Sequence, residues 1–397
     1  MIQISPETQL FIREHSSDDV RTLALQAKKY PDINMPTAIT QIAGRQVAAE
    51  KIPSWREIEE IWYPKHLSLE QCSSEITARY KARLFQGDSL TDLTGGFGID
   101  CSFLATGFKS ATYVERQEEL CEIAAHNFPI LNLNHINVRN EDGVAYLQTM
   151  SPVDCIFLDP ARRNEHGGKT VAISDCEPNV AELEALLLSK ANRVMIKLSP
   201  MLDLSLALKE LKQTQEVHIL SVNNECKELL ILLGQTSPTE ISIHCVNLST
   251  KGTQEEQHFV FTREQEQCSS QCTYTDSLGN YLYEPNASLL KAGAFRSIAA
   301  AYPVRKLHPN SHLYISDSFI ENFPGRIFRI VNQCSFNKKE VKENLADLKK
   351  ANVTVRNFPA TVAELRKRLH LTEGGDTYLF ASTLNNGQKV IIRCEKV

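Results

Sequence analysis

Four acidic side chains follow short apolar segments at intervals typical of a nucleotide-binding sheet: Asp92, Glu115, Asp142 and Asp159. A glycine-rich loop over residues 94–98 comes directly after the first of them. Glycines let the backbone turn sharply and approach a ligand closely, and the amides of a following helix point at that ligand. Glu115 can accept hydrogen bonds from ribose hydroxyls and Asp142 from an adenine amino group, although a solvated charge and a helix cap are the alternatives.

The tetrad Asp159-Pro160-Ala161-Arg162 follows the very apolar segment Cys155–Leu158. A buried strand here would bring an acid and a proline to the carboxyl edge of a sheet, where ligands bind. Proline restricts how the chain leaves the strand, so that backbone carbonyls and the carboxylate can point at a reacting nitrogen atom of a substrate. Arg162 and Arg163 could contact a phosphate or stack on a base, or could simply be solvated charges. We therefore expect Asp159, Pro160 and Arg162 at a reaction centre.

A dinucleotide fingerprint would need a third glycine at position 101, and this chain has Cys101 there. The loop spacing therefore disfavours NAD as the ligand.

The elements that must position these residues alternate between short strands and helices, as in a Rossmann-like α/β sheet. The last two strands are joined by so few residues that we expect an antiparallel hairpin at the sheet edge. The predicted strands of this seven-stranded sheet are Ser89–Leu93, Ser110–Glu115, Ile136–Arg139, Asp154–Leu158, Arg193–Lys197, Glu216–Val222 and Glu228–Leu233.

The pattern predicts four parts: a helical N-terminal domain (1–66), the α/β domain (67–237), a β-rich extension or linker (238–284) and an α+β region (285–397). The expected helices at the N-terminal end are Asp18–Lys29, Pro36–Lys51, Arg56–Trp62 and Glu75–Phe85, and those of the last region are Ser288–Ala301, Lys338–Lys350 and Thr361–Leu369.

Composition narrows the class of protein. The 397 residues show no apolar run of membrane-spanning length and no signal-peptide pattern, so a cytoplasmic location is expected. The eleven cysteines include one close pair, Cys268 and Cys272, without a partner pair, and no metal site is predicted.

The charge is unevenly distributed along the chain. From Asn286 onward there are 18 Lys and Arg and nine Asp and Glu, a net charge of +9, whereas the residues before Asn286 have a net charge of −14. A basic terminal region is typical of nucleic-acid binding.

Residues 67–234 resemble the class I S-adenosylmethionine-dependent methyltransferases, and within them a bacterial group of RNA methyltransferases with a C-terminal THUMP-like domain. Ser73-Ser74-Glu75 resembles the Thr-Pro-Glu element of trimethylguanosine synthase-like enzymes, with Ser in place of both Thr and Pro. The resemblance continues to the chain end, through Asn286–Arg296, Asn322–Arg326, Arg356–Pro359, Leu365–Leu369 and Gly374–Phe380.

The resemblance implies S-adenosylmethionine as cofactor and RNA, tRNA or rRNA, as partner. Its cofactor-binding positions would be Ser74, Asp92, Thr94, Gly96, Gly98, Glu115, Asp142 and Asp159. Enzymes of the group that methylate exocyclic amines often carry a second proline and an aromatic where this chain has Ala161 and Arg162, so the acceptor atom does not carry over. The expected RNA contacts are Arg366, Lys367, Arg368, Lys338 and Lys339.

Two other functions fit the same residues. One is a methyltransferase for a protein or a small molecule, whose basic region serves another purpose. The other is a non-catalytic RNA-binding protein that has kept the cofactor fold without the reaction.

Overall fold

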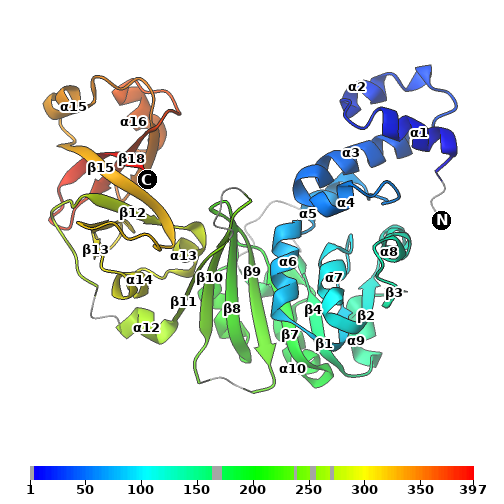
Figure 1. Cartoon of the computed structure of the whole chain (residues 1–397). Helices are drawn as coiled ribbons and strands as arrows, with labels where there is room; N and C mark the ends of the chain where they lie inside the picture. The colour runs from blue at the N-terminus through cyan, green and yellow to red at the C-terminus, as the bar shows by residue number, and fades with distance from the viewer. Residues whose placement is uncertain (1–3, 163–171, 237–238, 251–255, 269–271) are drawn as a thin grey trace. The chain divides into compact units, whose positions relative to one another are not determined.

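The computed structural model (Figure 1) describes residues 4–162, 172–236, 239–250, 256–268 and 272–397. The chain divides into two compact units, residues 1–215 with 229–238 and residues 216–228 with 239–397. In the described residues, no helix combines the length and the apolar character needed to span a bilayer.

Short helices with well-defined N-terminal caps form the beginning of the first unit. Side chains of Ser5, Asp19 and Asn34 accept backbone N–H groups at the starts of three of them, as capping residues do. The helices are α1 (Pro6–Glu14), α2 (Val20–Leu25), a 3-10 turn (Ala27–Lys29), α3 (Met35–Lys51), α4 (Pro53–Arg56), α5 (His66–Gln71) and α6 (Glu75–Leu84).

The prediction of a helix over residues 56–62 is wrong. The helical turn α4 ends at Arg56, and the chain then continues without helix to α5. Tertiary contacts explain the difference: Ile61 and Tyr63 are buried, and the backbone N–H of Trp62 donates to the Asn127 side chain at 2.9 Å. Backbone groups that bond to another element cannot also form the helical ladder.

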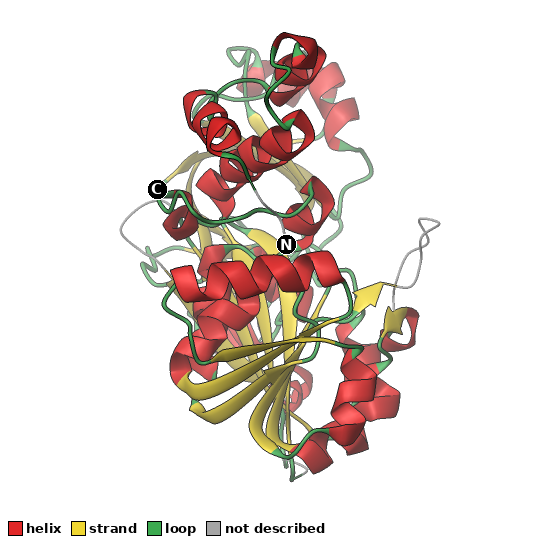
Figure 2. Cartoon of the chain, turned by 90° about the vertical axis from the view of Figure 1, so that its right-hand side faces the viewer, coloured by secondary structure: helices red, strands yellow, loops and turns green. Residues whose placement is uncertain are grey.

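A nine-stranded sheet runs in the order β11-β10-β8-β9-β7-β4-β1-β2-β3, and β3, β2, β1, β4 and β7 are parallel neighbours. Figures 1 and 2 show the sheet with the helices that connect its strands. The strands are β1 (Gly87–Asp92), β2 (Phe108–Glu115), β3 (Ile136–Asn140), β4 (Val153–Leu158), β7 (Ala191–Leu198), β8 (Thr214–Val222), β9 (Glu225–Gly234), β10 (Ser242–Leu248) and β11 (Glu256–Thr262).

Seven of these strands are the predicted Rossmann-like set, and β9 runs antiparallel to β7. The predicted hairpin of β8 and β9 turns at Asn223 and Asn224, both with positive φ. Its expected place at the sheet edge is wrong, because β10 pairs in parallel with β8 and β11 pairs with β10. Two strands of the predicted extension therefore continue the sheet.

Short helices link the parallel strands of the first unit. Burial at helical spacing explains them: α8, for example, buries Leu120, Ile123, Ala124 and Phe128. The remaining elements of this unit are α7 (Ile99–Leu104), a 3-10 turn (Ala105–Gly107), α8 (Glu118–Ile130), α9 (Gly143–Thr149), β5 (Ala161–Arg162), a 3-10 turn (Ile173–Asp175), β6 (Cys176–Glu177), α10 (Val180–Lys190) and α11 (Leu204–Glu210).

The second unit also contains a seven-stranded sheet in the order β13-β14-β12-β15-β18-β17-β16, antiparallel except for β16 with β17. Its core joins residues such as Leu282, Ile315, Phe328 and Ile392. The elements are α12 (Arg263–Cys268), β12 (Tyr281–Pro285), α13 (Ala287–Ala292), α14 (Ser297–Ala301), β13 (Arg305–Lys306), β14 (Tyr314–Ser316), β15 (Gly325–Ser335), α15 (Lys338–Leu345), β16 (Asn352–Arg356), α16 (Val362–Leu369), β17 (Thr377–Thr383) and β18 (Lys389–Lys396).

The single helix predicted over 288–301 is two helices, α13 and α14. Gly293 takes a left-handed conformation (φ 77°) at the C-cap of α13 and ends it, as glycine commonly does. The helix predicted over 338–350 is shorter than expected and ends at Leu345.

Candidate functional site

The glycine loop after β1 is held tightly against β2. The backbone N–H of Gly95 donates to the carbonyl of Val114 at 2.9 Å, and a Cβ at Gly95 would lie 2.2 Å from the ring of Tyr113. Gly96 and Gly98 have φ of 53° and 88°, a region that side chains rarely adopt. Gly98 is also the N-cap of α7. The glycines therefore allow a turn that brings backbone amides to the carboxyl edge of the sheet.

Asp92 ends β1 beneath this loop and is 1% exposed. Its Oδ1 accepts the backbone N–H of Thr94 at 3.0 Å, while Oδ2 has no hydrogen-bond partner among the described residues. Burial, helped by the neighbouring carboxylates of Asp100 and Asp159, raises the pKa of Asp92 to about 8, and the bond from Thr94 opposes this shift. Asp92 is thus a buried acid with one oxygen unpartnered, and a cationic ligand beside that oxygen would favour its ionised form.

Asp159 and Pro160 leave β4 next to the glycine loop. The backbone N–H of Asp159 donates to Thr94 Oγ1 at 2.6 Å, so the Thr94 hydroxyl connects the two predicted motifs directly. The N–H of Leu93 bonds to the carbonyl of Phe157 at 3.0 Å and continues the β1–β4 ladder up to this point. The predicted convergence of Asp92, Thr94 and Asp159 is therefore present in the structure.

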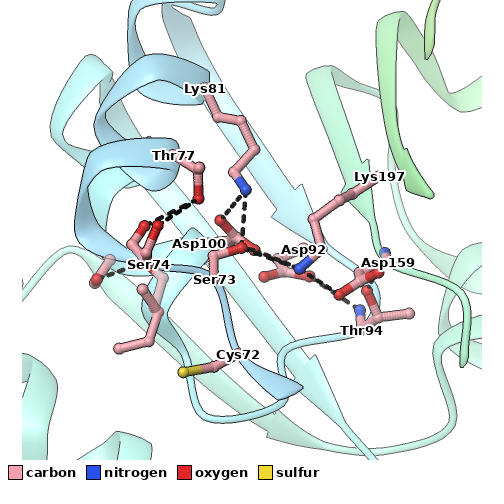
Figure 3. Close-up of polar contacts among 12 residues, drawn as sticks. Cys72, Ser73, Ser74, Thr77, Lys81, Asp92, Thr94, Asp100, Asp159 and Lys197 are labelled. Carbon is pink, nitrogen blue, oxygen red and sulfur yellow. Dashed lines mark hydrogen bonds and ion pairs between the residues drawn. The ribbon is translucent and has the colours of Figure 1, made fainter. Parts of the chain in front are cut away.

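Two lysines and Asp100 form a buried polar network that reaches the partly exposed Asp159 (Figure 3). Lys197 Nζ lies 2.5 Å from Asp159 Oδ2 and 3.2 Å from Asp100 Oδ2, and Lys81 Nζ lies 2.9 Å from Asp100 Oδ1. Ser73 Oγ donates to Asp100 at 2.7 Å and accepts from both ammonium groups. Lys81 is completely buried. The network therefore joins α6 and α7 to the carboxyl ends of β4 and β7.

Burial and the nearby lysines shift the pKa values of Asp100 and Asp159 in opposite directions. Burial alone would raise the pKa of Asp100, but Lys197 and Lys81 outweigh it and hold that pKa well below its usual range. Burial also raises the pKa of Asp159, and here the Lys197 ammonium only partly opposes it. Asp100 is thus a permanent anion, whereas Asp159 is the acid that can exchange a proton closer to neutral pH.

The sequence patterns do not single out Lys81 or Asp100, and Ser73 stands out only as part of the Ser73-Ser74-Glu75 element. An acid in the first turn of α7 and a lysine on α6 resemble ordinary surface positions in sequence. The sequence places Lys197 at the end of the fifth predicted strand, on the same sheet edge as the acceptor pocket, but does not show its pairing with Asp100 and Asp159. The one available signal was that a lysine ended an otherwise apolar strand, since an unpaired buried ammonium is costly.

Glu115 ends β2 and is 9% exposed. Its two carboxylate oxygens accept backbone N–H groups of Gly96 and Gln117, each at 2.9 Å. In the structure it therefore fixes the glycine loop, and the lone pairs that remain on each oxygen can still accept hydroxyl donors.

Asp142 is the N-cap of α9, accepting from Val144 and Ala145 at 3.0 Å. Both bonds use Oδ1, so Oδ2 takes no part in the cap. Gly143 places this helix start against the first loop, because a Cβ there would lie 2.1 Å from the carbonyl oxygen of Leu93. The cap alternative is correct, and the adenine role remains a prediction.

Ser74 is the N-cap of α6, but its hydroxyl makes no capping bond to the helix backbone and instead contacts Thr77 Oγ1 at 3.2 Å. Arg162 belongs to strand β5, paired with β6, and its side chain lies outside the described part of the structure, as does Arg163. The catalytic role predicted for Arg162 therefore stays a prediction.

The predicted RNA contacts lie on two helices of the second unit. Lys338 and Lys339 on α15 and Lys367 on α16 are exposed. Arg366 pairs with Glu373 at 3.0 Å, and the Arg368 guanidinium lies 4.0 Å from the centroid of the Phe336 ring. The lysines are thus better placed for phosphate contacts than the two arginines, which already have partners.

The chain matches two protein-family models and a solved structure of similar length. A family model for a ferredoxin-like domain matches residues 281–324, and one for a THUMP-like domain matches residues 325–396. A crystal structure described as a "putative methyltransferase from Porphyromonas gingivalis W83" matches with 34% identity and a TM-score of 0.88 over 100% of both chains. No curated protein matches the sequence.

More distant structures match only part of the chain. An rRNA methylase from Streptococcus thermophilus shares 14% identity (TM-score 0.30) over 40% of this chain and 93% of its own. A SAM-dependent methyltransferase from Agrobacterium tumefaciens shares 16% identity (TM-score 0.30) over 41% of this chain and 61% of its own. At such scores these two carry no argument about this protein. The full-length match does: the chain belongs to the family of the Porphyromonas gingivalis protein, with a methyltransferase fold and a C-terminal THUMP-like domain.

Proposed function

We propose that this protein transfers a methyl group from S-adenosylmethionine to a base in RNA. The observation that carries the proposal is the meeting of Asp92 and Asp159 at the carboxyl edge of the sheet, joined through Thr94. Ligands of open α/β sheets bind at this edge. The family and its methyltransferase fold support the same reaction class.

The residues at this edge fit the proposed cofactor. S-adenosylmethionine carries an ammonium group, and the unpartnered Oδ2 of buried Asp92 is a suitable acceptor for it. A nearby cation favours the ionised form of an acid, so binding would release the proton that Asp92 holds at neutral pH. Glu115 would accept from the ribose hydroxyls, and Asp142 Oδ2 from the adenine amino group. Ser74, Gly96 and Gly98 would complete the lining.

The protein's own groups would orient the acceptor rather than activate the donor. When bound, the cofactor supplies an already activated methyl group, so alignment provides most of the acceleration. Asp159 and the backbone around Pro160 would hold the acceptor nitrogen. Lys197 keeps the Asp159 carboxylate in place. If the acceptor retains its proton, Asp159 is the group that would remove it, because its pKa is raised.

RNA is the proposed acceptor because of the C-terminal region. Residues 325–396 match a THUMP-like domain, and this region presents exposed lysines at 338, 339 and 367. Lysines of this kind contact phosphates and position a nucleic acid without reading its sequence.

Binding measurements test the two halves separately. Intact protein and Asp92→Asn are compared for S-adenosylmethionine affinity by calorimetry, and intact protein is compared with a Lys338→Ala, Lys339→Ala, Lys367→Ala variant for tRNA and rRNA affinity. We expect Asp92→Asn to lower only the affinity for S-adenosylmethionine, and the triple lysine variant to lower only the affinity for RNA. Absence of cofactor binding by the intact protein would contradict it, and cofactor binding without RNA binding would favour a protein or small-molecule acceptor.

A further inference from the structure

Three histidines and Glu216 gather on one face of strands β8, β10 and β11 in the second unit. Strand register places them together: His244 pairs with His218 in the parallel ladder, and His258 pairs with Val246, two residues along from His244. Glu216 precedes His218 by two residues and therefore shares its face. Side chains far apart in the sequence thus become neighbours.

The nitrogen and oxygen atoms of this group are close enough to share one ion. His218 Nε2 lies 3.1 Å and His244 Nε2 lies 3.9 Å from the same Glu216 oxygen, Oε2. One ligand atom from each of the three residues falls within 4.8 Å of the others. Zinc ligands at roughly 2.1 Å in a tetrahedron are separated by about 3.4 Å, a value between these two distances.

The tautomers of His244 show why a cation would be favourable. Its Nδ1 lies 3.1 Å from His258 Nε2, so one of these two nitrogens donates to the other. If His244 Nδ1 donates, its Nε2 lone pair faces a carboxylate oxygen. If it accepts, its Nε2 carries a proton 3.9 Å from that oxygen, too far for a hydrogen bond. A metal ion between Nε2 and Glu216 resolves the first case, in which a ring nitrogen and an oxygen both offer lone pairs.

Packing fixes the rings of His218 and His244 against each other. His218 is 2% exposed, and its ring stacks on that of His244 with centroids 4.3 Å apart. Burial, with smaller contributions from the neighbouring His218 and His258, lowers the pKa of His244 to about 4, and Glu216 opposes this shift. Neutral imidazole is the form in which histidine binds metals.

We propose that Glu216, His218 and His244 form a binding site for a divalent transition metal of the zinc class, with His258 or water as the fourth ligand. Two imidazoles and one carboxylate match the ligand types that zinc takes, and a soft thiolate is not needed. The metal would tie β8 to β10, strands that enter the sheet from separate parts of the chain. The composition alone predicts no metal, because only the strand register reveals the cluster.

The test uses the tag-free full-length chain, stripped with a chelator and titrated with Co²⁺ and then Zn²⁺. Every version carries Cys268→Ser and Cys272→Ser, because these two cysteines are a possible independent zinc pair. Visible absorption of Co²⁺ reports its geometry, and competition with a chromophoric chelator gives the Zn²⁺ affinity. His218→Gln and His244→Gln remove ligands, and His370→Asn changes an exposed histidine of the same unit as the matched control.

We expect one equivalent of metal to bind, with a tetrahedral Co²⁺ spectrum and no thiolate charge-transfer band. Each ligand variant should lose more Zn²⁺ affinity than the ~10–100-fold that follows loss of a group merely supporting a ligand. His370→Asn should bind like the parent.

Zn²⁺ should also raise the melting temperature of the parent, but not of His244→Gln, which keeps the test valid if buried His218→Gln folds poorly. The proposal fails if the parent binds no metal at micromolar free Zn²⁺, or if His244→Gln binds as tightly as the parent.

Discussion

Lys197 Nζ lies 2.5 Å from Asp159 Oδ2 and also contacts Asp100, so one ammonium joins the predicted reaction centre to a buried anion. Asp100 keeps its second partner, Lys81, which is completely buried. Lys197, itself held by Asp100, therefore fixes the position of the Asp159 carboxylate, and neither residue needs to contact a substrate to do so.

Lys197→Met is expected to shift the acidic limb of the methyl-transfer pH profile to higher pH. Without the ammonium, the pKa of Asp159, already raised by burial, rises further, and a higher pH is needed to ionise it. Removing one partner of a buried ion pair typically lowers the free energy of unfolding by ~3–5 kcal/mol. Because Lys81 would still pair with Asp100, we expect the loss for Lys197→Met to lie near the lower end of that range. The profile is measured for Lys197→Met and for exposed Lys209→Met. An acidic limb identical in both would refute the role given to Lys197.

Cofactor affinity is expected to depend on pH through Asp92. Its pKa of about 8 in the ligand-free protein means that a proton must leave before the carboxylate can pair with a cation. Affinity for S-adenosylmethionine should therefore rise between pH ~6 and ~8, by at most about tenfold per unit, and stop rising where the ligand's amino group begins to lose its own proton.

Asp92→Asn supplies the matched comparison, since it keeps the shape of the side chain but cannot ionise. Calorimetry across this pH range should show a weaker and much flatter affinity for Asp92→Asn than for intact protein. Equal slopes in the two proteins would show that another group titrates.

Thr94→Val should loosen the junction between the glycine loop and the Asp159-Pro160 turn. The Asp159 N–H would lose its acceptor, at a cost of ~1–3 kcal/mol if no water replaces it. Thr94→Ser keeps the hydroxyl and is the control. Urea denaturation together with methyl-transfer rates should show losses for Val and little change for Ser. A loss in Thr94→Ser as large as that in Thr94→Val would contradict the role given to the hydroxyl.

Much of this junction follows from the sequence because local rules determine it. Apolar segments that end in Asp92, Glu115 and Asp159 are strands of one parallel sheet, and their carboxyl ends must share an edge. Gly96 and Gly98 turn the chain as glycines should. Such features depend on neighbours in the chain, and the sequence displays those.

The remainder depends on packing between distant elements. Nothing near Lys81 in the sequence shows that α6 brings it to Asp100 on α7. The pairing of β10 with β8 is likewise a long-range choice, and with it the meeting of His218 and His244. The segment over 56–62 has helical periodicity but bonds to α8 instead through Asn127. Tertiary contacts override local propensity in each case.

RNA affinity is expected to depend on the lysines at 338, 339 and 367. Changing all three to Ala should weaken RNA binding and reduce the slope of log K against log salt by about 0.7–0.9 for each lost phosphate contact. Filter binding at several salt concentrations measures both quantities. A Lys28→Ala, Lys29→Ala variant removes two exposed positive charges of the first unit as the control. If it lowers the slope as much as the triple variant, the RNA site lies elsewhere.

Transfer of tritium from methyl-labelled S-adenosylmethionine into total RNA, taken from a strain that lacks this gene, tests the central claim most directly. Intact protein and Asp159→Asn are compared, because Asn is nearly isosteric but cannot ionise. We predict labelled RNA with intact protein and at least ~100-fold less with Asp159→Asn, the lower range for loss of a general base. Cofactor binding by intact protein without any label in this RNA would contradict the proposed substrate, and equal labelling by both proteins would contradict the proposed site.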